Sequence, residues 1–328
     1  MTATKREREI FGSSVQIVSR SDDQVVYKII DKTGQVVMTS NKIFPGIQLI
    51  YNDVHARRCF VEHTVRGSII EINHCKEGRI ECEFQDDFFY LTQGDISISI
   101  KNEAPHESYF PISHYHGVSV MIDVDKAPES LSCFLEGVDV CPSALIEKFC
   151  KSSAYFVARS TPRLEQVFSE LYTIPNSMKK GYFKIKVLEL LLFLSIIDLT
   201  ENESCKRSVK KSRVTLAKGV CNYLSERMDS HVTISELAEI FHVSQTALKN
   251  SFKDVYGLSV YSFMRAQKMQ AAALMLRQTE CTVLEIAGKY GYDNGSKFAG
   301  AFKNVMGMTP NEYRNINNEE SVVIYNHQ

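Results

Sequence analysis

The sequence predicts an α+β protein in two parts, with antiparallel strands and flanking helices first and an all-α part after them. Three observations support this prediction. Residues 25–100 hold short runs of β-branched and aromatic side chains, the periodicity becomes helical from about Cys141, and one set of helix signals recurs in the last third of the chain. A chain of 328 residues that is 44% hydrophobic and 23% charged has the length and composition of two globular domains.

The predicted strands are short and lie between turn signals such as Glu77-Gly78. In the last of them Ile96, Ile98 and Ile100 alternate with serines, so the three isoleucines share one face. Strands at this spacing predict an antiparallel barrel or sandwich. The predicted strands are Val25–Ile30, Ser68–Asn73, Arg79–Phe84, Phe88–Leu91 and Ile96–Ile100.

Helical periodicity follows in two segments. Side chains at i, i+3, i+4 and i+7 form one apolar helix face, and they are Leu164, Val167, Phe168 and Leu171. The second segment, Ile185–Leu199, is apolar on almost every side of the helix after Val187. This helix either packs on the strands or forms a dimer interface, and both interpretations can hold together.

The polar segment Glu201–Arg213 has no apolar period and is predicted to be an interdomain linker. The net charge of −1 is unevenly distributed, because Lys and Arg outnumber Asp and Glu from Cys205 to Ile316. A basic segment joined to an acidic one is a common layout for a DNA-binding domain attached to a sensing domain. The predicted boundaries are 1–200 for the N-terminal domain, 201–213 for the linker, 214–316 for the C-terminal domain and 317–328 for a tail.

The cellular compartment is also predicted from composition. The polar start, Met1 to Glu9, indicates no secretory signal peptide, and the longest apolar run, Leu190–Ile197, is too short to span a membrane. Nine cysteines without a CxxC pair are typical of thiols in a reducing environment. We therefore expect a cytoplasmic protein with no membrane association.

The strongest signal is an internal repeat. The run Thr233-Ile-Ser-Glu236-Leu237-Ala238 recurs 49 residues later as Thr282-Val-Leu-Glu285-Ile286-Ala287. The pair Phe252-Lys253 recurs 50 residues later as Phe302-Lys303. The change of offset predicts one inserted residue in the second copy, near its turn.

Each copy begins with Thr-x-x-Glu, a capping box in which the Thr hydroxyl and the Glu carboxylate each accept a backbone N–H of the other residue. A break and a second cap follow, at Ser244 in the first copy and at Asp293 or Asn294 in the second. A further box, Thr309-Pro310-Asn-Glu312, starts another helix. Helix, tight turn and capped helix is the helix-turn-helix layout, whose second helix enters the major groove of DNA.

A longer pattern connects this repeat to a known family. The run Val283-x-x-Ile286-Ala287-x-x-x-Gly291-Tyr292-x-x-Gly-Ser296-Lys-Phe298-x-x-x-Phe302-Lys303-x-x-x-Gly307-x-Thr309-Pro310-x-x-Tyr313-Arg314 resembles the C-terminal signature of AraC/XylS-type regulators. The resemblance covers roughly Leu216 to Arg314. It implies seven helices, with a long helix between the two units at Val260–Arg277. It also implies an N-terminal cupin-like antiparallel β-barrel that binds an effector and contributes to dimerisation.

By this resemblance the recognition helices run from about Gln245 to Val255 and from about Gly295 to Val305. Asn and Gln side chains can pair with adenine, and Lys can donate to guanine. Gly300 departs from the family, which often has an arginine there, so we expect the second unit to use phosphate contacts and DNA shape. The expected DNA-binding residues are Gln245, Thr246, Lys249, Asn250 and Lys253 in the first unit, and Ser296, Lys297 and Lys303 in the second.

Four histidines are candidate effector-binding residues of the N-terminal domain: His74, His106, His114 and His116. His114 and His116 alternate and so share a strand face, where either of the other two would complete a cupin-type metal set. The usual cupin metal motif, with its clustered His and Glu, is absent. We therefore predict no metal and no cofactor, and interpret these histidines as hydrogen-bonded groups in or beside a pocket.

Together these observations predict a non-enzymatic, sequence-specific transcription activator that binds double-stranded promoter DNA as a homodimer. A small-molecule effector of unknown identity would control it, and RNA polymerase is a candidate partner. Two alternatives stay open. One is a cupin enzyme or metal-binding sensor with a DNA-binding appendage, which metal analysis would reveal. The other is a ligand-independent architectural or interaction protein, which no ligand would stabilise against heat.

Overall fold

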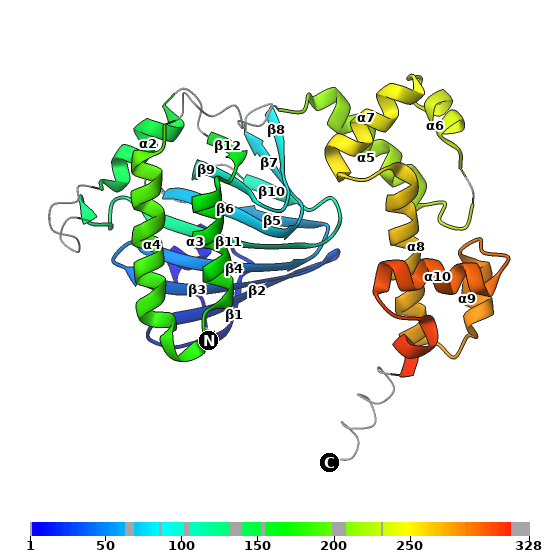
Figure 1. Cartoon of the computed structure of the whole chain (residues 1–328), viewed down its shortest axis with the longest axis horizontal. Coiled ribbons are helices and arrows are strands. Elements are labelled where there is room, and N and C mark those ends of the chain that lie inside the picture. Colours follow the sequence, from blue (N-terminus) through cyan, green and yellow to red (C-terminus); the bar gives the residue numbers. More distant parts are fainter. Residues whose placement is uncertain are drawn as a thin grey trace, which may run out of the picture. The chain divides into compact units, whose positions relative to one another are not determined.

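The computed structural model describes residues 2–62, 69–84, 87–101, 105–131, 140–151, 155–198, 208–230 and 232–315. The chain divides into two compact units, Met1–Val209 and Lys210–Gln328, the first built around strands and the second from helices (Figure 1). Residues 201–207 of the predicted linker and all of the predicted tail lie outside the described residues. Within the described ranges, no helix is both long and apolar enough to cross a membrane.

The strands of the N-terminal unit form two antiparallel sheets. The larger sheet has the order β1-β2-β3-β4-β11-β6-β9-β12, and the smaller has the order β5-β10-β7-β8. Their bounds are β1 Gln16–Arg20, β2 Gln24–Asp31, β3 Gly34–Phe44, β4 Ile47–His55, β5 Arg58–Glu62, β6 Ile69–Gly78, β7 Ile80–Phe84, β8 Asp87–Leu91, β9 Asp95–Lys101, β10 Pro105–Tyr109, β11 Tyr115–Asp123 and β12 Tyr155–Arg159.

The predicted closed barrel is not confirmed, because in the described residues β1 and β12 are the two edges of an open larger sheet. One apolar cluster lies between the two sheets and joins side chains such as Ile50 and Met121 of the larger sheet to Phe89 and Leu91 of the smaller one. Short runs of strand residues predict antiparallel pairing but not closure, since closure depends on which strands become neighbours.

Helices cover the other face of the larger sheet. Their bounds are α2 Pro142–Cys150, α3 Pro162–Thr173 and α4 Lys179–Ile196, and a short helix, α1 Lys5–Phe11, precedes the first strand. The helices α2–α4 lie over one face of the larger sheet (Figure 1). A second apolar cluster lies beneath them, and the predicted α3 face of Leu164, Val167, Phe168 and Leu171 is fully buried in it. The helix α4 buries five side chains in this cluster, while Ile185 and Ile196 are exposed. The sheet-packing interpretation of this apolar helix is therefore confirmed.

The C-terminal unit consists of helices arranged as two similar pairs. Their bounds are α5 Lys211–Ser225, α6 Ile234–Ile240, α7 Gln245–Tyr256, α8 Val260–Gln278, α9 Val283–Lys289 and α10 Gly295–Met306, and residues 310–315 are again helical. The long helix α8 lies between the pair α6–α7 and the pair α9–α10 (Figure 1). The expected arrangement of two helix pairs around a long helix is confirmed.

Candidate nucleic-acid interface

The first helix pair is built by local caps. The Thr233 hydroxyl accepts the backbone N–H of Glu236 at 3.2 Å, and the Glu236 carboxylate accepts that of Thr233 at 2.7 Å, so the predicted capping box is present. His242 reverses the chain between the helices with φ of 53°, in the left-handed region. The Ser244 hydroxyl then accepts the N–H of Ala247 and starts α7. The second helix of the pair therefore has a fixed starting point.

The helix α7 has two contrasting faces. Leu248, Phe252 and Val255 are completely buried, and they hold the helix against its neighbours. On the outside, the five side chains predicted to meet DNA are all exposed: Gln245, Thr246, Lys249, Asn250 and Lys253. Their spacing of four residues between Gln245 and Lys249, and again to Lys253, places them along one stripe of the helix.

The second helix pair repeats this construction with one more residue in its turn. Four residues, 241–244, separate α6 from α7, and five, 290–294, separate α9 from α10. The predicted insertion is thus confirmed to lie in the turn, where Gly291 has φ of 79°. The cap of α10 is Asn294, whose side chain accepts the N–H groups of Ser296 and Lys297.

The outer face of α10 is sparser than that of α7. Ser296, Lys297 and Lys303 are exposed, as a groove-facing role requires. Gly300 lies between them, and a methyl group built on it would meet nothing within 4 Å. Phe298 and Phe302 are fully buried on the opposite face. This helix therefore offers fewer side chains to a base edge than α7 does.

Three polar contacts fix parts of this unit to each other. The Arg213 guanidinium pairs with Asp254 at 2.5 Å and so ties α5 to α7. The Lys268 ammonium of α8 donates to the Tyr290 carbonyl at 3.2 Å, next to the turn of the second pair, and burial lowers the pKa of Lys268. The Arg314 guanidinium donates to the Cys281 carbonyl. That hydrogen bond joins the helical residues 310–315 to the segment that precedes α9.

The four N-terminal histidines do not form one site. His74 is buried, 1% exposed, and its Nε2 lies 3.0 Å from Oε2 of Glu165 on α3. His106 belongs to β10, but its side chain lies outside the described part of the chain. His114 and His116 lie together, as their alternation predicts. The structure joins to them His55, a residue that the sequence analysis missed.

The His55–His114–His116 group forms where β4 ends and β11 begins. His116 is the cross-strand partner of Asp53, which alternates with His55 on β4. The pair Asp53-x-His55 is therefore the sequence signal that could have indicated this residue. Burial, and then the neighbouring imidazoles of His116 and His55, lower the pKa of His114. Its neutral imidazole keeps a lone pair available as an acceptor or ligand.

A pocket of about 400 Å³ opens elsewhere on the N-terminal unit. Ile43, Ile47 and Ile69 contribute apolar surface to it. Five cations line it, Arg6, Lys42, Lys126, Lys180 and Lys184, against the two carboxylates of Asp23 and Asp123, which gives a net charge of +3. None of the four predicted histidines lines this pocket.

Comparison with known proteins finds similarity mainly in the helical part. Residues 237–316 match the family model described as a helix-turn-helix domain. The Transposon Tn10 TetD protein of Escherichia coli is 30% identical over 105 residues, which are 32% of this chain and 76% of that protein. The arabinose operon regulatory protein of Escherichia coli is 25% identical over 148 residues, which are 45% of this chain and 51% of that protein.

Among solved structures, the C-terminal domain of AraT, a response regulator from Geobacillus stearothermophilus, is 31% identical to this chain, with a TM-score of 0.30. The match covers 31% of this chain and 84% of that domain. The chain spans about half the length of the arabinose regulator that it matches, and most of the N-terminal unit lies outside the sequence matches described above.

Proposed function

We propose, since this chain belongs to the AraC/XylS family of transcription regulators, that it binds double-stranded promoter DNA sequence-specifically and activates transcription. The observation that carries the proposal is the pair of capped helices α7 and α10, each with a buried apolar face and an exposed polar face. A helix of this kind enters the major groove with its N-terminal side chains near base edges.

The two helices would contribute differently to recognition. On α7, Gln245 and Asn250 have amides that suit adenine, and Lys249 can donate to guanine. Thr246 and Lys253 lie on the same face and can contact a base or phosphate. On α10, Ser296, Lys297 and Lys303 would act mainly through the DNA backbone and its shape, because Gly300 has no side chain to read a base.

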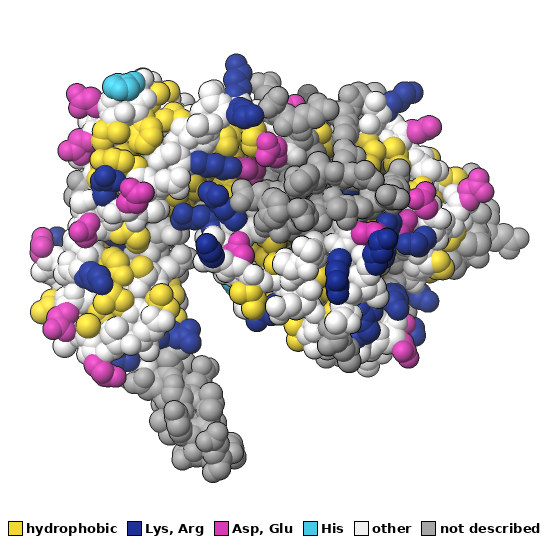
Figure 2. All heavy atoms as spheres, turned by 180° about the vertical axis from the view of Figure 1, so that it is seen from behind, with side chains coloured by type: hydrophobic (Ala, Val, Ile, Leu, Met, Phe, Trp, Pro, Cys, Tyr) yellow, Lys and Arg dark blue, Asp and Glu magenta, His cyan; other side chains and the backbone are white. Residues whose placement is uncertain are grey.

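Overall charge is not the basis of this assignment. On the face seen in Figure 2, Lys and Arg side chains lie among Asp, Glu and apolar side chains over both units. The recognition helices themselves are more uniform, because α10 contains no Asp or Glu and α7 contains only Asp254, which pairs with Arg213. The electrostatic attraction to phosphates would therefore come from a few lysines on these helices.

For the N-terminal unit we propose an effector-binding role, in the pocket with the net charge of +3. Its apolar side chains and cationic lining suit a small anion with an apolar body. Such a ligand should raise the melting temperature of the chain, since it stabilises the form it binds. The double variant Lys42→Gln/Lys184→Gln should lose that rise, and a rise that persists would place the ligand elsewhere.

Dimerisation is part of the proposal. Ile185 and Ile196 of α4 are 61% and 65% exposed, although the same helix is buried along its other side. Two exposed isoleucines on one helix favour a self-contact that removes them from water. RNA polymerase remains a candidate partner for an activator bound near a promoter.

The DNA-binding proposal is tested by selecting duplexes from a random pool with the full chain and measuring their affinity as the salt concentration is raised. We expect one enriched motif and an affinity that falls steeply with salt, because bound lysines release counterions. Enrichment of no motif, together with an affinity that does not change with salt, would overturn it.

A further inference from the structure

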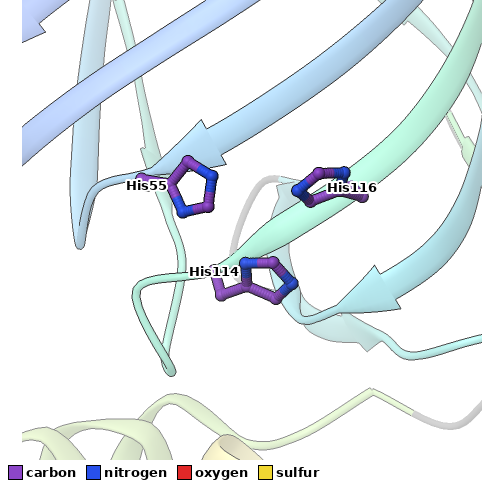
Figure 3. A group of neighbouring side chains, drawn as sticks. All are labelled: His55, His114 and His116. Atoms are coloured by element: carbon purple, nitrogen blue, oxygen red, sulfur yellow. The ribbon is translucent and has the colours of Figure 1, made fainter. Parts of the chain in front are cut away.

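A cluster of three histidines on the N-terminal unit has no part in the function proposed above. His55 at the end of β4, His114 directly before β11 and His116 near the start of β11 have ligand nitrogens that all lie within 4.8 Å of one another. Figure 3 shows the three rings around a common space between these two strands. Ring centroids of His114 and His116 are 4.8 Å apart, and those of His55 and His114 are 5.4 Å apart.

Two carboxylates add negative charge to the cluster. Asp53 Oδ1 lies 2.9 Å from Nε2 of His55 and 2.9 Å from Nε2 of His116. Glu77 Oε2 lies 3.8 Å from Nε2 of His114. Three imidazole nitrogens and a carboxylate oxygen close together are a donor set that first-row transition metals prefer.

The hydrogen bonding of Asp53 points the same way. Although two imidazole nitrogens are within ion-pair distance of Oδ1, this buried oxygen has no hydrogen-bond partner among the described residues. Neither N–H therefore points at the oxygen closely enough to satisfy it. A buried carboxylate oxygen without a partner is costly, and a bound cation would remove that cost.

We propose that His55, His114 and His116 bind one divalent transition-metal ion of the zinc type, with Asp53 as the fourth ligand or as the group that orients two of the imidazoles. Tetrahedral bonds of about 2.0–2.1 Å place ligand atoms about 3.4 Å apart, so the cluster has to contract by about an ångström on binding. The side chains have room for this movement, because His55 is 52% exposed, His114 35% and His116 36%.

The site differs from the one that the sequence suggested. His74 packs against α3 and is not a member of the cluster. The third histidine of the cluster is His55 of β4. The proposal is also independent of DNA binding, since none of its residues belongs to the C-terminal unit.

The test uses the full chain without a histidine tag, stripped with a chelator and titrated calorimetrically with Zn²⁺. We expect one ion per chain, and a loss of at least tenfold in affinity in His55→Gln and in His116→Gln. Asp53→Asn should weaken binding by about 10–100-fold, as is usual for a group that orients metal ligands. His242→Asn is the matched control, because this exposed histidine lies in the other unit and asparagine tolerates its φ of 53°.

Substitution with Co²⁺ distinguishes these ligands from the cysteines. Nitrogen and oxygen ligands give visible d–d absorption alone, whereas thiolate ligands add a charge-transfer band. Unchanged thermal melting of the metal-free variants would show that they are folded. The proposal is overturned if the wild-type chain binds less than one ion, if the double variant His55→Gln/His116→Gln binds as tightly as wild type, or if the cobalt protein shows thiolate charge transfer.

Discussion

The imidazole of His74 stacks on the ring of Phe168, with 4.1 Å between the ring centroids and 8° between the planes. Its Nε2 lies 3.0 Å from Glu165 and its Nδ1 lies 3.5 Å from the Tyr172 hydroxyl. His74 is therefore a packing residue between the larger sheet and α3. This contact explains why it does not join His114 and His116, although all three had been candidates for one site.

Burial of His74 predicts a pH-dependent stability. Desolvation lowers the pKa of this imidazole below its ordinary value of 6.5, even though Glu165 acts in the opposite direction. Because the folded pKa lies below the unfolded one, its contribution to stability is complete above about pH 6.5 and is lost as the pH falls through the folded pKa. Urea unfolding should show a larger loss of free energy between about pH 7.5 and pH 5.5 in wild type than in His74→Phe.

The phenylalanine variant retains the ring contact with Phe168 and removes the titrating nitrogen atoms. If both proteins lose the same unfolding free energy over that pH range, His74 does not cause the dependence.

The capping boxes that begin α6 and α9 should contribute equally to stability. The Thr282 hydroxyl accepts the Glu285 N–H at 3.2 Å, and the Glu285 carboxylate accepts the Thr282 N–H at 2.7 Å, as in the first pair. These contacts also lower the pKa of Glu285. We expect Thr282→Ala and Thr233→Ala each to cost about 1 kcal/mol of unfolding free energy. Thr282→Ser should retain most of the stability that the cap contributes, because serine keeps the hydroxyl. Equal stability of the Ala and Ser variants would contradict the capping role.

Gly300 should be replaceable, with a gain in stability. It lies inside α10 with open space around the position of a Cβ, so Gly300→Ala should stabilise the unit by about 0.5–1 kcal/mol in chemical unfolding. Gly288→Ala in α9 is the matched control, since its Cβ also meets nothing within 4 Å. Both variants should have a higher melting temperature than the wild-type chain, and Gly288→Ala should bind DNA with unchanged affinity.

Gly300→Arg should add a phosphate or base contact to the second unit. We expect tighter DNA binding and a salt dependence steeper by about 0.9 in log–log slope, the value for one further neutralised phosphate. A slope equal to that of Gly300→Ala would mean that this part of α10 does not face the DNA.

Lys249 and Asn250 should determine base preference. Both are exposed on α7, and each lies beside a buried residue that fixes the helix, Leu248 and Ser251. We expect Lys249→Ala and Asn250→Ala each to weaken binding to the selected DNA sequence by about 1–3 kcal/mol. Each should also relax the base preference at one position of that sequence. Lys32→Ala, in the turn between β2 and β3, removes the same charge from the other unit. If Lys32→Ala weakened DNA binding as much as Lys249→Ala does, Lys249 would have no specific role in recognition.

Local signals explain why the C-terminal unit was predicted so closely. Thr233, Ser244 and Thr282 each satisfy backbone N–H groups within three residues, so these helix starts are visible in the sequence itself. The inserted residue in the second turn was likewise visible as a change in the repeat offset.

The N-terminal unit was predicted less completely because both faces of its larger sheet are covered. The strand β11 is buried on both sides from Gly117 to Asp123, and β4 carries apolar and polar side chains on both of its faces, so neither strand shows the regular Ile–Ser alternation of β9. The histidine cluster was missed for a related reason. Its third member depends on the pairing of His116 with Asp53, a register that no local pattern sets.

The most direct test of the central claim is to map the DNA that the chain occupies in the cell that encodes it, beside the double variant Lys249→Ala/Asn250→Ala expressed at the same level. We predict discrete peaks upstream of genes that share one motif for the wild-type chain, and loss of these peaks in the variant. Wild-type occupancy without discrete peaks, or peaks that the variant retains with the same motif, would contradict sequence-specific recognition through α7.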